Sequence, residues 1–579
     1  MRYPKEGNKD VSLVICGEAG QGIKTVEELL VKVLKRSGYH VHSIKEYESR
    51  VRGGSNSTSI RVSSVRVRAP VKRVDIAFPM TPDAVWHIRW RMDENTTVIC
   101  DPDLAGELEG NGDFNVLRTE IKKRAEEIGG SIYINIVVAG MIAGYFDVEE
   151  DLFDEVLEER FSGKGEKALE KNLKARKAGY GIAEEMKKEG ELDVDLEEDD
   201  GVKDEILMRG VNSISLGALA GGCDTISSYP MSPSTGVLVD LASRQKKYGV
   251  IAEQAEDEIS AMNMALGSWY AGGRAMVTTS GGGFALMSEG MSLAGMLELP
   301  MVVHLAQRPG PATGLPTRTE QGDLFLALFS GHGDLPRAIY APADIEQGFD
   351  LTRRAFETAD RFQVPVVVLT DQFLVDSHYN VKELDLSFED PKRHIEKTES
   401  GYKRYRITEN GVSPRGVPGH GGGLVKMDSD EHDEEGHITE SMEVRVKMVD
   451  KRMRKLDLLK DDVLPPMLIG DGEGIVVLCW GSTLHTVKEA VACLDRDDIS
   501  ILHLRQVHPL SQSIRDIIEG SRMTIGVENN ATGQLSSLIR MELGLEVEHR
   551  ILKYDGLPFT VEELADEVEK VLEKGGEWK

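Results

Sequence analysis

Residues 11–38 read VSLVICGEAGQGIKTVEELLVKVLKRSG, and this stretch indicates the fold of the first part of the chain. Its first six residues form an apolar run of strand length. A turn rich in glycine follows, and apolar residues then recur every three or four positions, as they do on one face of a helix. The order strand, turn, helix is typical of an open α/β sheet.

The same alternation continues through most of the chain. Strand-like runs are predicted at 40–44, 74–78, 97–100, 225–229, 250–252, 275–279, 300–306, 365–370, 475–480, 499–504 and 523–527. Helical patterns separate many of them, as at 257–271 and 284–294. Strands that alternate with helices predict an α/β fold with mostly parallel sheets, whose ligands bind at the carboxyl ends of the strands.

This pattern divides the chain into three α/β domains. The stretch from 184 to 205 holds 12 acidic and three basic residues, which is typical of a solvated linker or a frayed helix end. A second interruption is rich in glycine, proline and charge. The predicted segments are a first domain at 1–190, an acidic linker at 191–208, a second domain at 209–391, a joining segment at 392–465 and a third domain at 466–579.

The composition limits the classes of function. The 579 residues include 69 Lys plus Arg and 98 Asp plus Glu, a formal net charge of −29. An acidic surface repels nucleic-acid phosphates, so we expect no nucleic-acid partner. The N-terminal residues MRYPKEGNKD lack the apolar core of a secretory signal, and no apolar run reaches the ~18–20 residues that cross a bilayer. We therefore expect a cytoplasmic protein without membrane contact.

The five cysteines are dispersed along the chain and form no C-x-x-C pair. Neither a zinc site nor a four-cysteine iron–sulfur cluster is therefore encoded locally. We expect buried or reduced thiols and no metal site.

The first glycine turn, GEAGQG, contains Gly17, Gly20 and Gly22 between a strand and a helix. Backbone amides in such a turn can approach an anion at the positive end of the helix. Its G-x-x-G-x-G spacing differs from the dinucleotide fingerprint, and the P-loop G-K-[ST] is absent. Two interpretations stay open: contact with a phosphate or pantetheine nucleotide, or a tight turn in an interface domain. The turn RVRGGS at 50–55 carries two arginines suited to pairing with a phosphate or a carboxylate, and a surface loop that contacts a partner subunit is its other interpretation.

Four turns follow four predicted strands of the second domain. They read YPMSPST at 229–235, EQAEDE at 253–258, TTSGGG at 278–283 and HLAQR at 304–308. Because the carboxyl ends of parallel strands share one edge of a sheet, we expect these turns to form a convergent site. Glu256 is the candidate for a buried functional carboxylate, whereas Asp257 and Glu258 suit the N-terminus of the next helix. Arg308 suits bidentate binding of a substrate carboxylate.

These turns carry a family resemblance. YPMSPST, EQAEDEISAMNMALGSWYAGGRAM, TSGGGFALMSEGMSLAGMLELP and QRPGPATGLPTRTEQGDL resemble the alpha subunit of 2-oxoacid:ferredoxin oxidoreductases, in particular the 2-oxoglutarate branch of this thiamine-diphosphate family. GEAGQGIKTVEELL and SRVRGGSNSTSIRVS resemble its gamma subunit, here fused in front. VENNATGQLSSLIR resembles its transketolase-C-terminal-like domain, and DEHDEEGHITES with KMVDKRMRKL resembles the piece that joins the last two domains.

The resemblance implies a gamma-type α/β domain, a pyrimidine-binding α/β domain of thiamine-diphosphate enzymes and a transketolase-C-terminal-like α/β domain. It implies that Glu256 hydrogen-bonds the aminopyrimidine ring of the cofactor, and that Ser232 and Arg308 bind the substrate. The cofactor-binding set that it implies is Tyr229, Glu256, Ser280 and Gly281, with Gly17, Gly20 and Gly22 near coenzyme A. The sequence departs from the family in TSGGG, where alpha subunits often have TSGPG; glycine permits the same turn.

The resemblance also implies partners. A separate beta subunit would carry Mg²⁺ and a 4Fe-4S cluster and share the thiamine diphosphate, in a dimer of heterodimers. The complex would decarboxylate a 2-oxoacid oxidatively, pass the electrons to ferredoxin and transfer the acyl group to coenzyme A. The first expected substrate is 2-oxoglutarate, giving succinyl-CoA, and pyruvate or broad 2-oxoacid specificity is the alternative. A non-catalytic, partner-binding paralogue is the alternative of another class.

Three further features have competing interpretations. For the acidic loop with His432 and His437 we expect a solvated loop rather than a metal site. For the basic helical run at 444–460 we expect packing on acidic residues of this chain or its partner. Residues 528–530, Glu-Asn-Asn, end a strand and suit a subunit interface or a ligand, in that order.

Overall fold

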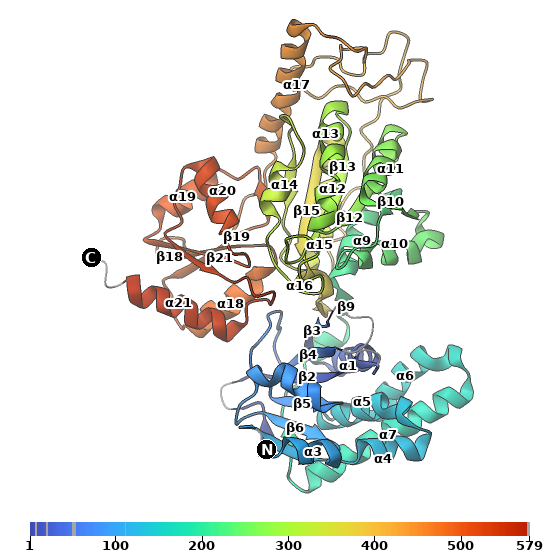
Figure 1. The fold of residues 1–579 in the computed structure, drawn as a ribbon, viewed down its shortest axis with the longest axis vertical. Helices are drawn as coiled ribbons and strands as arrows, with labels where there is room; N and C mark the ends of the chain where they lie inside the picture. The colour runs from blue at the N-terminus through green and yellow to red at the C-terminus, as the bar shows by residue number, and fades with distance from the viewer. Residues whose placement is uncertain (6–7, 19–20, 49–53, 111, 576–579) are drawn as a thin grey trace. The chain divides into compact units, whose positions relative to one another are not determined.

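The computed structural model describes residues 1–5, 8–18, 21–48, 54–110 and 112–575 (Figure 1). The chain forms two compact units. Unit 1 comprises residues 1–209, 377–383 and 560–562, and unit 2 comprises 210–376, 384–559 and 563–579. Each unit is therefore built from segments that are distant in the sequence.

The sheet of unit 1 has the strand order β7-β6-β5-β2-β4-β3-β16-β9. Its strands are β2 (Asp10–Glu18), β3 (His40–Glu46), β4 (Ser55–Ser63), β5 (Ile76–Pro79), β6 (Thr97–Cys100), β7 (Asn115–Arg118), β9 (Ile206–Arg209) and β16 (His378–Val381). The strands predicted at 11–16, 40–44, 74–78 and 97–100 are confirmed as β2, β3, β5 and β6. The pattern did not predict β7, β9, β16 or β4, which pairs antiparallel with β2 and β3. A short parallel pair, β1 (Arg2–Tyr3) with β8 (Asp193–Val194), lies apart from this sheet.

Helices cover both faces of this sheet. Because successive side chains of a strand point to opposite faces, β2 contributes to two separate cores. Leu13 and Ile15 of β2 pack in one core, with side chains of α1, α5, α6 and α7, whereas Val14 and Cys16 pack in another, with α2 and α3. The helices of unit 1 are α1 (Ile23–Ser37), α2 (Pro82–Ile88), α3 (Pro102–Leu108), α4 (Ile121–Ile128), α5 (Ile134–Tyr145), α6 (Glu150–Phe161), α7 (Glu166–Lys188) and α8 (Asp200–Lys203).

In the part of the chain that the structure describes, no single helix is long and apolar enough to cross a membrane. The pair Ile121–Ile128 and Ser131–Tyr145 passes that test only when its members are joined, and they meet at 116°. Most residues of α5 are buried in the core of unit 1.

The main sheet of unit 2 has the order β11-β10-β12-β13-β15-β14-β20 and is parallel except for the pair β14–β20. Its strands are β10 (Thr225–Ser228), β11 (Ile251–Gln254), β12 (Ala275–Thr279), β13 (Met301–Gln307), β14 (Ala338–Tyr340), β15 (Pro365–Asp371) and β20 (Gln506–His508). The five strands predicted in this region are confirmed, and β14 and β20 were not predicted. The helices are α9 (Gly210–Ala220), α10 (Thr235–Tyr248), α11 (Glu258–Tyr270), α12 (Gly281–Leu286), α13 (Ser288–Leu297), α14 (Leu324–Phe329), α15 (Ile345–Phe362) and α16 (Gln372–Asp376).

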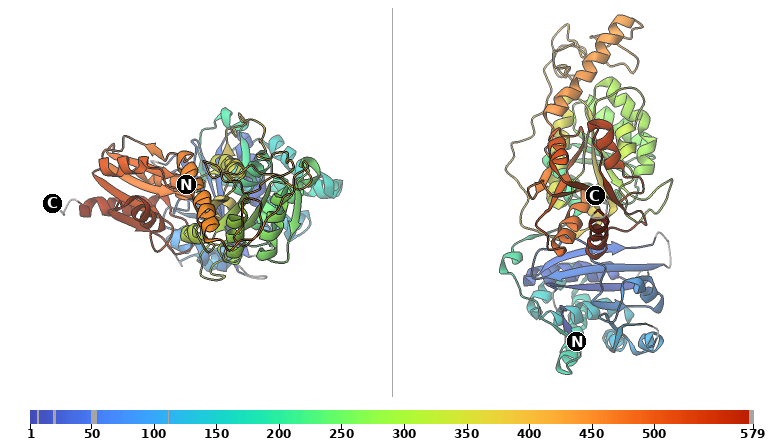
Figure 2. Two further views of the ribbon diagram at one scale, coloured as in Figure 1. Left: turned by 90° about the horizontal axis from the view of Figure 1, so that it is seen from above. Right: turned by 90° about the vertical axis from the view of Figure 1, so that its left-hand side faces the viewer.

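The second sheet of unit 2 has the order β17-β19-β18-β21-β22. Its strands are β17 (Met467–Ile469), β18 (Ile475–Trp480), β19 (Ile499–Leu504), β21 (Met523–Glu528) and β22 (His549–Leu552). One face carries α19 (Ser513–Gly520) and α20 (Gln534–Leu543), and the other carries α18 (Leu484–Cys493) and α21 (Val561–Gly575) (Figures 1 and 2). The three strands predicted here are confirmed. Because β20 of the same segment pairs with β14, the two sheets belong to one unit.

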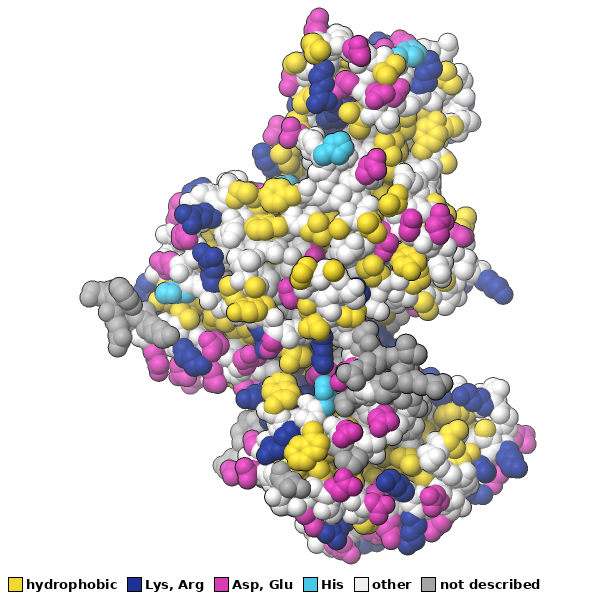
Figure 3. Space-filling model, viewed as in Figure 1, with side chains coloured by type: hydrophobic (Ala, Val, Ile, Leu, Met, Phe, Trp, Pro, Cys, Tyr) yellow, Lys and Arg dark blue, Asp and Glu magenta, His cyan; other side chains and the backbone are white. Residues whose placement is uncertain are grey.

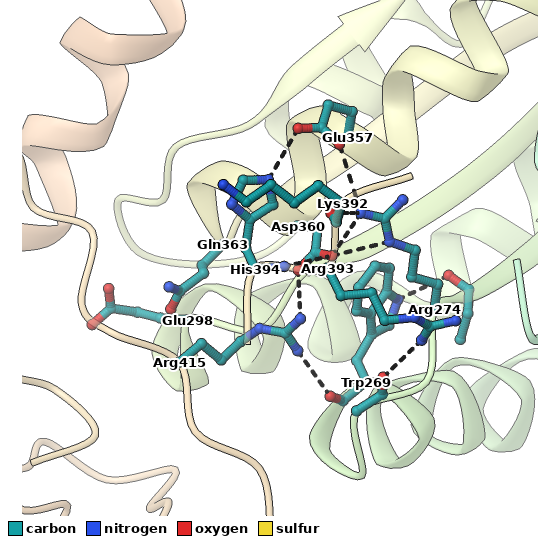
Figure 4. A network of polar contacts seen from close by, with 12 residues as sticks. Trp269, Arg274, Glu298, Glu357, Asp360, Gln363, Lys392, Arg393, His394 and Arg415 are labelled. Carbon is teal, nitrogen blue, oxygen red and sulfur yellow. Dashed lines mark hydrogen bonds and ion pairs between the residues drawn. The ribbon is translucent and has the colours of Figure 1, made fainter. Parts of the chain in front are cut away.

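A buried ion network fastens the joining segment to the main sheet (Figure 4). Arg274, which is 1% exposed, donates from Nε and Nη2 to one oxygen of Asp360 at 3.0 and 2.8 Å. Arg415 of the joining segment pairs with the other oxygen of Asp360. Two guanidinium groups thus compensate one buried carboxylate and fix the path of the chain, since a buried charge without a partner is strongly destabilising.

The basic run forms α17 (Met442–Asp461), which packs on acidic residues of the same chain, as predicted. Lys451 and Lys455, both fully buried, reach the two oxygens of Glu298 at 2.6 and 2.5 Å. Burial alone would raise the pKa of Glu298, but Lys451, Lys455 and Arg404 hold it well below its ordinary value. Burial lowers the pKa of Lys455 to about 8.

The acidic loop at 428–440 is not solvated throughout, so that expectation is wrong for His432. This side chain is fully buried, and the centroid of its ring lies 3.8 Å from the centroid of the Tyr405 ring. His437 is exposed beside Asp433 and Glu435. Within the described ranges, no group of three or more His, Cys, Asp or Glu side chains is arranged to hold a metal ion.

Candidate active site

The four turns follow neighbouring strands of one sheet, as predicted. The strands β11, β10, β12 and β13 are adjacent and parallel, so their carboxyl ends share an edge. A hydrogen-bonded relay holds three strands together at this edge: His304 contacts Thr278 of β12 at 2.7 Å and Thr370 of β15 at 2.8 Å. Burial lowers the pKa of His304 to about 3, so the ring stays neutral and does not charge the edge.

Arg308 and Ser232 are brought together. Arg308 Nη1 donates to the backbone carbonyl oxygen of Ser232 at 2.7 Å. Arg308 is half-buried, and this burial lowers its pKa, partly opposed by the charge of Asp323. The hydroxyl-bearing turn is open to ligand, because Ser232 is exposed and Tyr229 is 40% exposed. The guanidinium therefore lies over the strand ends with N–H groups available for an anion.

The buried carboxylate is Glu258, not Glu256. Asp257 is the N-cap of α11, as predicted, and its side chain accepts a hydrogen bond from the Ser260 amide at 2.7 Å. Glu256 precedes this cap and is exposed, so the prediction that it is the buried carboxylate is wrong. Glu258 is 4% exposed, and its Oε1 has no hydrogen-bond partner. The N-cap at Asp257 fixes which side of α11 is buried. The sequence contains a signal for this, because Glu258 is three residues before Ala261 and therefore lies on the same, buried face.

Glycine lets two carboxylates approach the turn between β12 and α12. A Cβ on Gly283 would stand 2.6 Å from Glu258 Oε1 and 2.2 Å from Thr279 Oγ1. A Cβ on Gly281 would stand 2.5 Å from both carboxylate oxygens of Asp323. The hydroxyl of Ser280, which begins this turn, is fully buried and has no hydrogen-bond partner. Three enclosed polar atoms without partners, on Glu258, Ser280 and Asp323, thus surround one turn, which is the pattern expected where a polar ligand binds.

Sequence reasoning quoted the loop that contains Asp323 but did not single this residue out. Burial raises the pKa of Asp323 to about 7, the negative charge of Glu320 raises it further, and Arg308 lowers it. The long-range approach of Asp323 to Gly281 has no local signal in the sequence.

Residues 528–530 anchor the loop between Arg308 and Asp323. Gln321 accepts from the Asn529 amide at 3.0 Å, and its carbonyl accepts from Asn530 Nδ2 at 3.2 Å. Glu528 is buried and accepts from the amides of Leu535 and Ser536. The second sheet of unit 2 thereby holds the loop that carries Arg308.

In unit 1, the first glycine turn borders a cavity of about 400 Å³. Gly22 has φ +77 and leaves no room for a Cβ, which would stand 2.2 Å from Asn135 Nδ2. Gly17 is as tightly packed, with Gln21 Oε1 2.4 Å from its would-be Cβ. Gly20 and the arginine turn at 50–53 lie outside the described residues. The cavity is lined by Gln21, Phe78, Pro79, Met80, Ile99, Asp101, Ile121, Lys122, Ser131, Ile132, Ile134, Asn135 and Val138.

Unit 2 also exposes large apolar side chains on the elements that flank the site. They include Val239, Ile251, Ile259, Met264 and Leu286 on α10, β11, α11 and α12. In the face drawn in Figure 3, apolar side chains gather over the middle of this unit, and charged side chains surround them. Apolar surface of this kind is typical of a protein–protein interface.

Two family models match the chain. The first, pyruvate flavodoxin/ferredoxin oxidoreductase, thiamine diphosphate-binding, matches residues 216–451, and the second, pyruvate ferredoxin/flavodoxin oxidoreductase, matches residues 12–182. A curated relative from Sulfolobus, a 2-oxoacid:ferredoxin oxidoreductase subunit alpha, is 29% identical over 98% of this chain and 97% of its own length. The 2-oxoglutarate synthase subunit KorA of Archaeoglobus fulgidus is 31% identical over 56% of this chain and 88% of its own length.

A solved structure agrees over nearly the whole chain. The 2-oxoglutarate:ferredoxin oxidoreductase from Magnetococcus marinus, with 2-oxoglutarate, coenzyme A and succinyl-CoA bound, superposes with a TM-score of 0.89. It is 30% identical, and the match covers 97% of this chain and 99% of that one. The fold, the thiamine-diphosphate-binding segment and the relatives agree: the chain belongs to the 2-oxoacid:ferredoxin oxidoreductase family and is of its alpha-subunit type.

Proposed function

We propose that the chain is the gamma–alpha fused subunit of a coenzyme-A-acylating 2-oxoacid:ferredoxin oxidoreductase, with 2-oxoglutarate as substrate and succinyl-CoA as product. Two observations carry this proposal: Arg308 and Ser232 meet at the carboxyl edge of the sheet, and the buried Glu258, whose Oε1 has no partner, approaches the turn that follows β12 at the same edge. The KorA relatives and the 2-oxoglutarate-bound neighbour support the substrate.

The residues of the site fit thiamine diphosphate. Glu258 presents a carboxylate oxygen without a partner, in a buried place, which suits the protonated nitrogen of an aminopyrimidine. We therefore assign to Glu258 the role that the resemblance gave to Glu256. Ser280 and Gly281 line the same turn and offer a hydroxyl and close backbone approach. When bound, the cofactor supplies a nucleophilic carbon for the 2-oxo group.

Arg308 would bind the carboxylate that every 2-oxoacid carries. A guanidinium binds a carboxylate through two parallel hydrogen bonds, which orients the neighbouring 2-oxo carbon as well as holding it. Ser232, whose carbonyl oxygen accepts from Arg308, offers its hydroxyl to the same group. The two residues would thus position the substrate, and burial around Glu258 would keep water from the reacting atoms.

The remaining components follow from the family. A beta subunit would share the thiamine diphosphate and supply Mg²⁺ and a 4Fe-4S cluster, ferredoxin would accept the electrons, and the assembly would be a dimer of heterodimers. The exposed apolar side chains around α11 and β11 support docking of that subunit beside the site. The cavity of unit 1, next to the turn with Gly17 and Gly22, supports contact with coenzyme A.

Broad 2-oxoacid specificity is the second candidate, because several relatives carry the general 2-oxoacid name. The test is reconstitution of this chain with its beta subunit, followed by coenzyme-A-dependent reduction of ferredoxin with 2-oxoglutarate, pyruvate or 2-oxobutyrate. A kcat/KM highest for 2-oxoglutarate supports the first proposal, and similar values for all three support broad specificity. A complex that assembles and turns over none of them would be the non-catalytic paralogue.

A further inference from the structure

Asp323 lies at the centre of the site in a position fixed by the backbone. Its amide donates to Gln307 Oε1 at 2.9 Å, and Gln307 Nε2 donates to the Thr370 carbonyl at 3.1 Å. These bonds hold the carboxyl group against the turn at Gly281, where a Cβ would stand 2.5 Å from both of its oxygens. The group is thus aimed at the same turn that Glu258 approaches from the other side.

A structural role does not explain this carboxyl group. Asp323 stands at the N-cap of α14, yet its side chain makes no capping hydrogen bond. Its Oδ2 is enclosed and has no hydrogen-bond partner. An ionised oxygen in that place is costly, whereas a protonated one needs an acceptor, which the described side chains around it do not provide.

Two charged groups act on Asp323. Arg308 follows β13, and Glu320 lies on the same loop as Asp323. Glu258 of α11 approaches another position of the same turn, Gly283. Burial and Glu320 favour the neutral acid and Arg308 favours the carboxylate, so the group can both give and take a proton near neutral pH.

We propose that Asp323 carries a proton to and from the 2-oxo oxygen of the substrate. The proposal rests on the proposed function. A 2-oxo carbon is bonded directly to the carboxylate that Arg308 would hold, so its oxygen would lie close to the guanidinium, which interacts electrostatically with Asp323. Addition of a nucleophilic carbon to the 2-oxo carbon moves the carbonyl π-electron pair to oxygen.

The proton of Asp323 then passes to that oxygen, and Asp323 becomes a carboxylate whose charge Arg308 offsets. When the carbon–oxygen double bond re-forms in the acyl product, the same proton returns to Asp323. The carboxyl group therefore ends the cycle as it began, and the step needs no further reactant beyond those of the proposed function.

The first test uses the assembled complex and the pH profile of kcat/KM for 2-oxoglutarate. A general acid must be protonated in the free enzyme, so activity should fall as the pH rises through the pKa of Asp323. Asp323→Asn should lower kcat roughly 10²- to 10⁴-fold and remove this falling limb. Glu320→Gln should keep the rate at low pH and shift the fall in kcat/KM to lower pH, because this variant lacks the negative charge of Glu320 that raises the pKa of Asp323.

The second test needs no turnover. Infrared spectra of the purified chain should contain the carbonyl band of a protonated carboxyl group that titrates near neutral pH, present in Glu320→Gln and absent in Asp323→Asn. Either a wild-type chain without this band, or an Asp323→Asn complex with normal rate and an unchanged limb, overturns the proposal. If Asp323→Asn is normal but Arg308→Met strongly lowers activity, only the role of Asp323 is overturned and the proposed function is retained. A wild-type complex that is inactive on all three 2-oxoacids would overturn the proposed function itself.

Discussion

Arg308 Nη1 donates a hydrogen bond to the Ser232 carbonyl oxygen at 2.7 Å, so the end of β13 is tied to the turn after β10 across the intervening β12. The bond fixes the direction of the guanidinium before any ligand binds. Less conformational entropy is then lost on binding than for a free arginine side chain. Arg308 is thus preorganised to receive an anion at the strand ends.

Arg308→Met should lower kcat/KM roughly ten- to a hundredfold or more, since a charge-assisted hydrogen bond contributes about 1.5–3 kcal/mol. The loss should be similar for 2-oxoglutarate, pyruvate and 2-oxobutyrate, which share the carboxylate next to the oxo group. Steady-state kinetics of the assembled complex measure it. A defect confined to 2-oxoglutarate would mean that Arg308 reads the distal carboxylate instead.

Glu258→Gln should abolish most turnover, by at least the roughly 10²-fold typical of a group that shares a proton in catalysis, and should leave assembly intact. Glu256→Gln is the matched control and should be close to wild type, because Glu256 is exposed. Turnover and thiamine diphosphate binding, followed by quenching of intrinsic fluorescence, are the measurements. If Glu256→Gln lost more turnover than Glu258→Gln, Glu256 would be the residue that contacts the aminopyrimidine ring.

Gly283→Ala should impair cofactor binding, because the new Cβ would stand 2.2 Å from Thr279 Oγ1 and 2.6 Å from Glu258 Oε1. Gly282→Ala should be tolerated, since its Cβ would meet only the Ala312 carbonyl oxygen at 3.7 Å. Both glycines lie in α12, so the pair separates steric effects from helix propensity. Equal thiamine diphosphate affinities of the two variants would contradict the close approach of Glu258 to this turn.

The chain purified without a partner should be colourless and should not decarboxylate any 2-oxoacid, because the proposed function puts the iron–sulfur cluster and the Mg²⁺ site on the beta subunit. An absorption spectrum and a carbon dioxide release assay check this. Adding the beta subunit should restore both colour and turnover. A brown isolated chain would contradict this division of labour.

Glu298→Gln should destabilise unit 2 by about 3–5 kcal/mol, the usual effect of leaving a buried charge without its partner. Two buried lysines, Lys451 and Lys455, would lose their common carboxylate. Glu443→Gln, which removes an exposed ion pair with Lys447 on the same helix, should cost at most about 0.5 kcal/mol. Urea unfolding of both variants provides the comparison, and equal midpoints would show that the buried cluster contributes nothing to stability.

Most of the fold and part of the site could be predicted from the sequence. Strands such as β12, β18 and β19 matched their predicted ranges, because a short apolar run bounded by glycine or charge is a local signal. The convergence of four turns followed from parallel strand order alone, and the quoted motifs carried the family. Strand β4 was missed because its first five residues, SNSTS, are all polar and only Ile60 and Val62 are apolar.

What the sequence by itself determined is therefore whatever neighbouring residues specify together: strands, helices, turns and the family that their motifs resemble. The burial of Glu258 also has a local signal, because the cap at Asp257 and the spacing to Ala261 set which side of α11 is buried. Only the tertiary structure brought Asp323 against Gly281, and Gln321 against Asn529 and Asn530. The physical reason is that a hydrogen bond across 208 residues, or a carboxylate fitted against a missing Cβ, depends on packing between elements and leaves no periodicity in the chain.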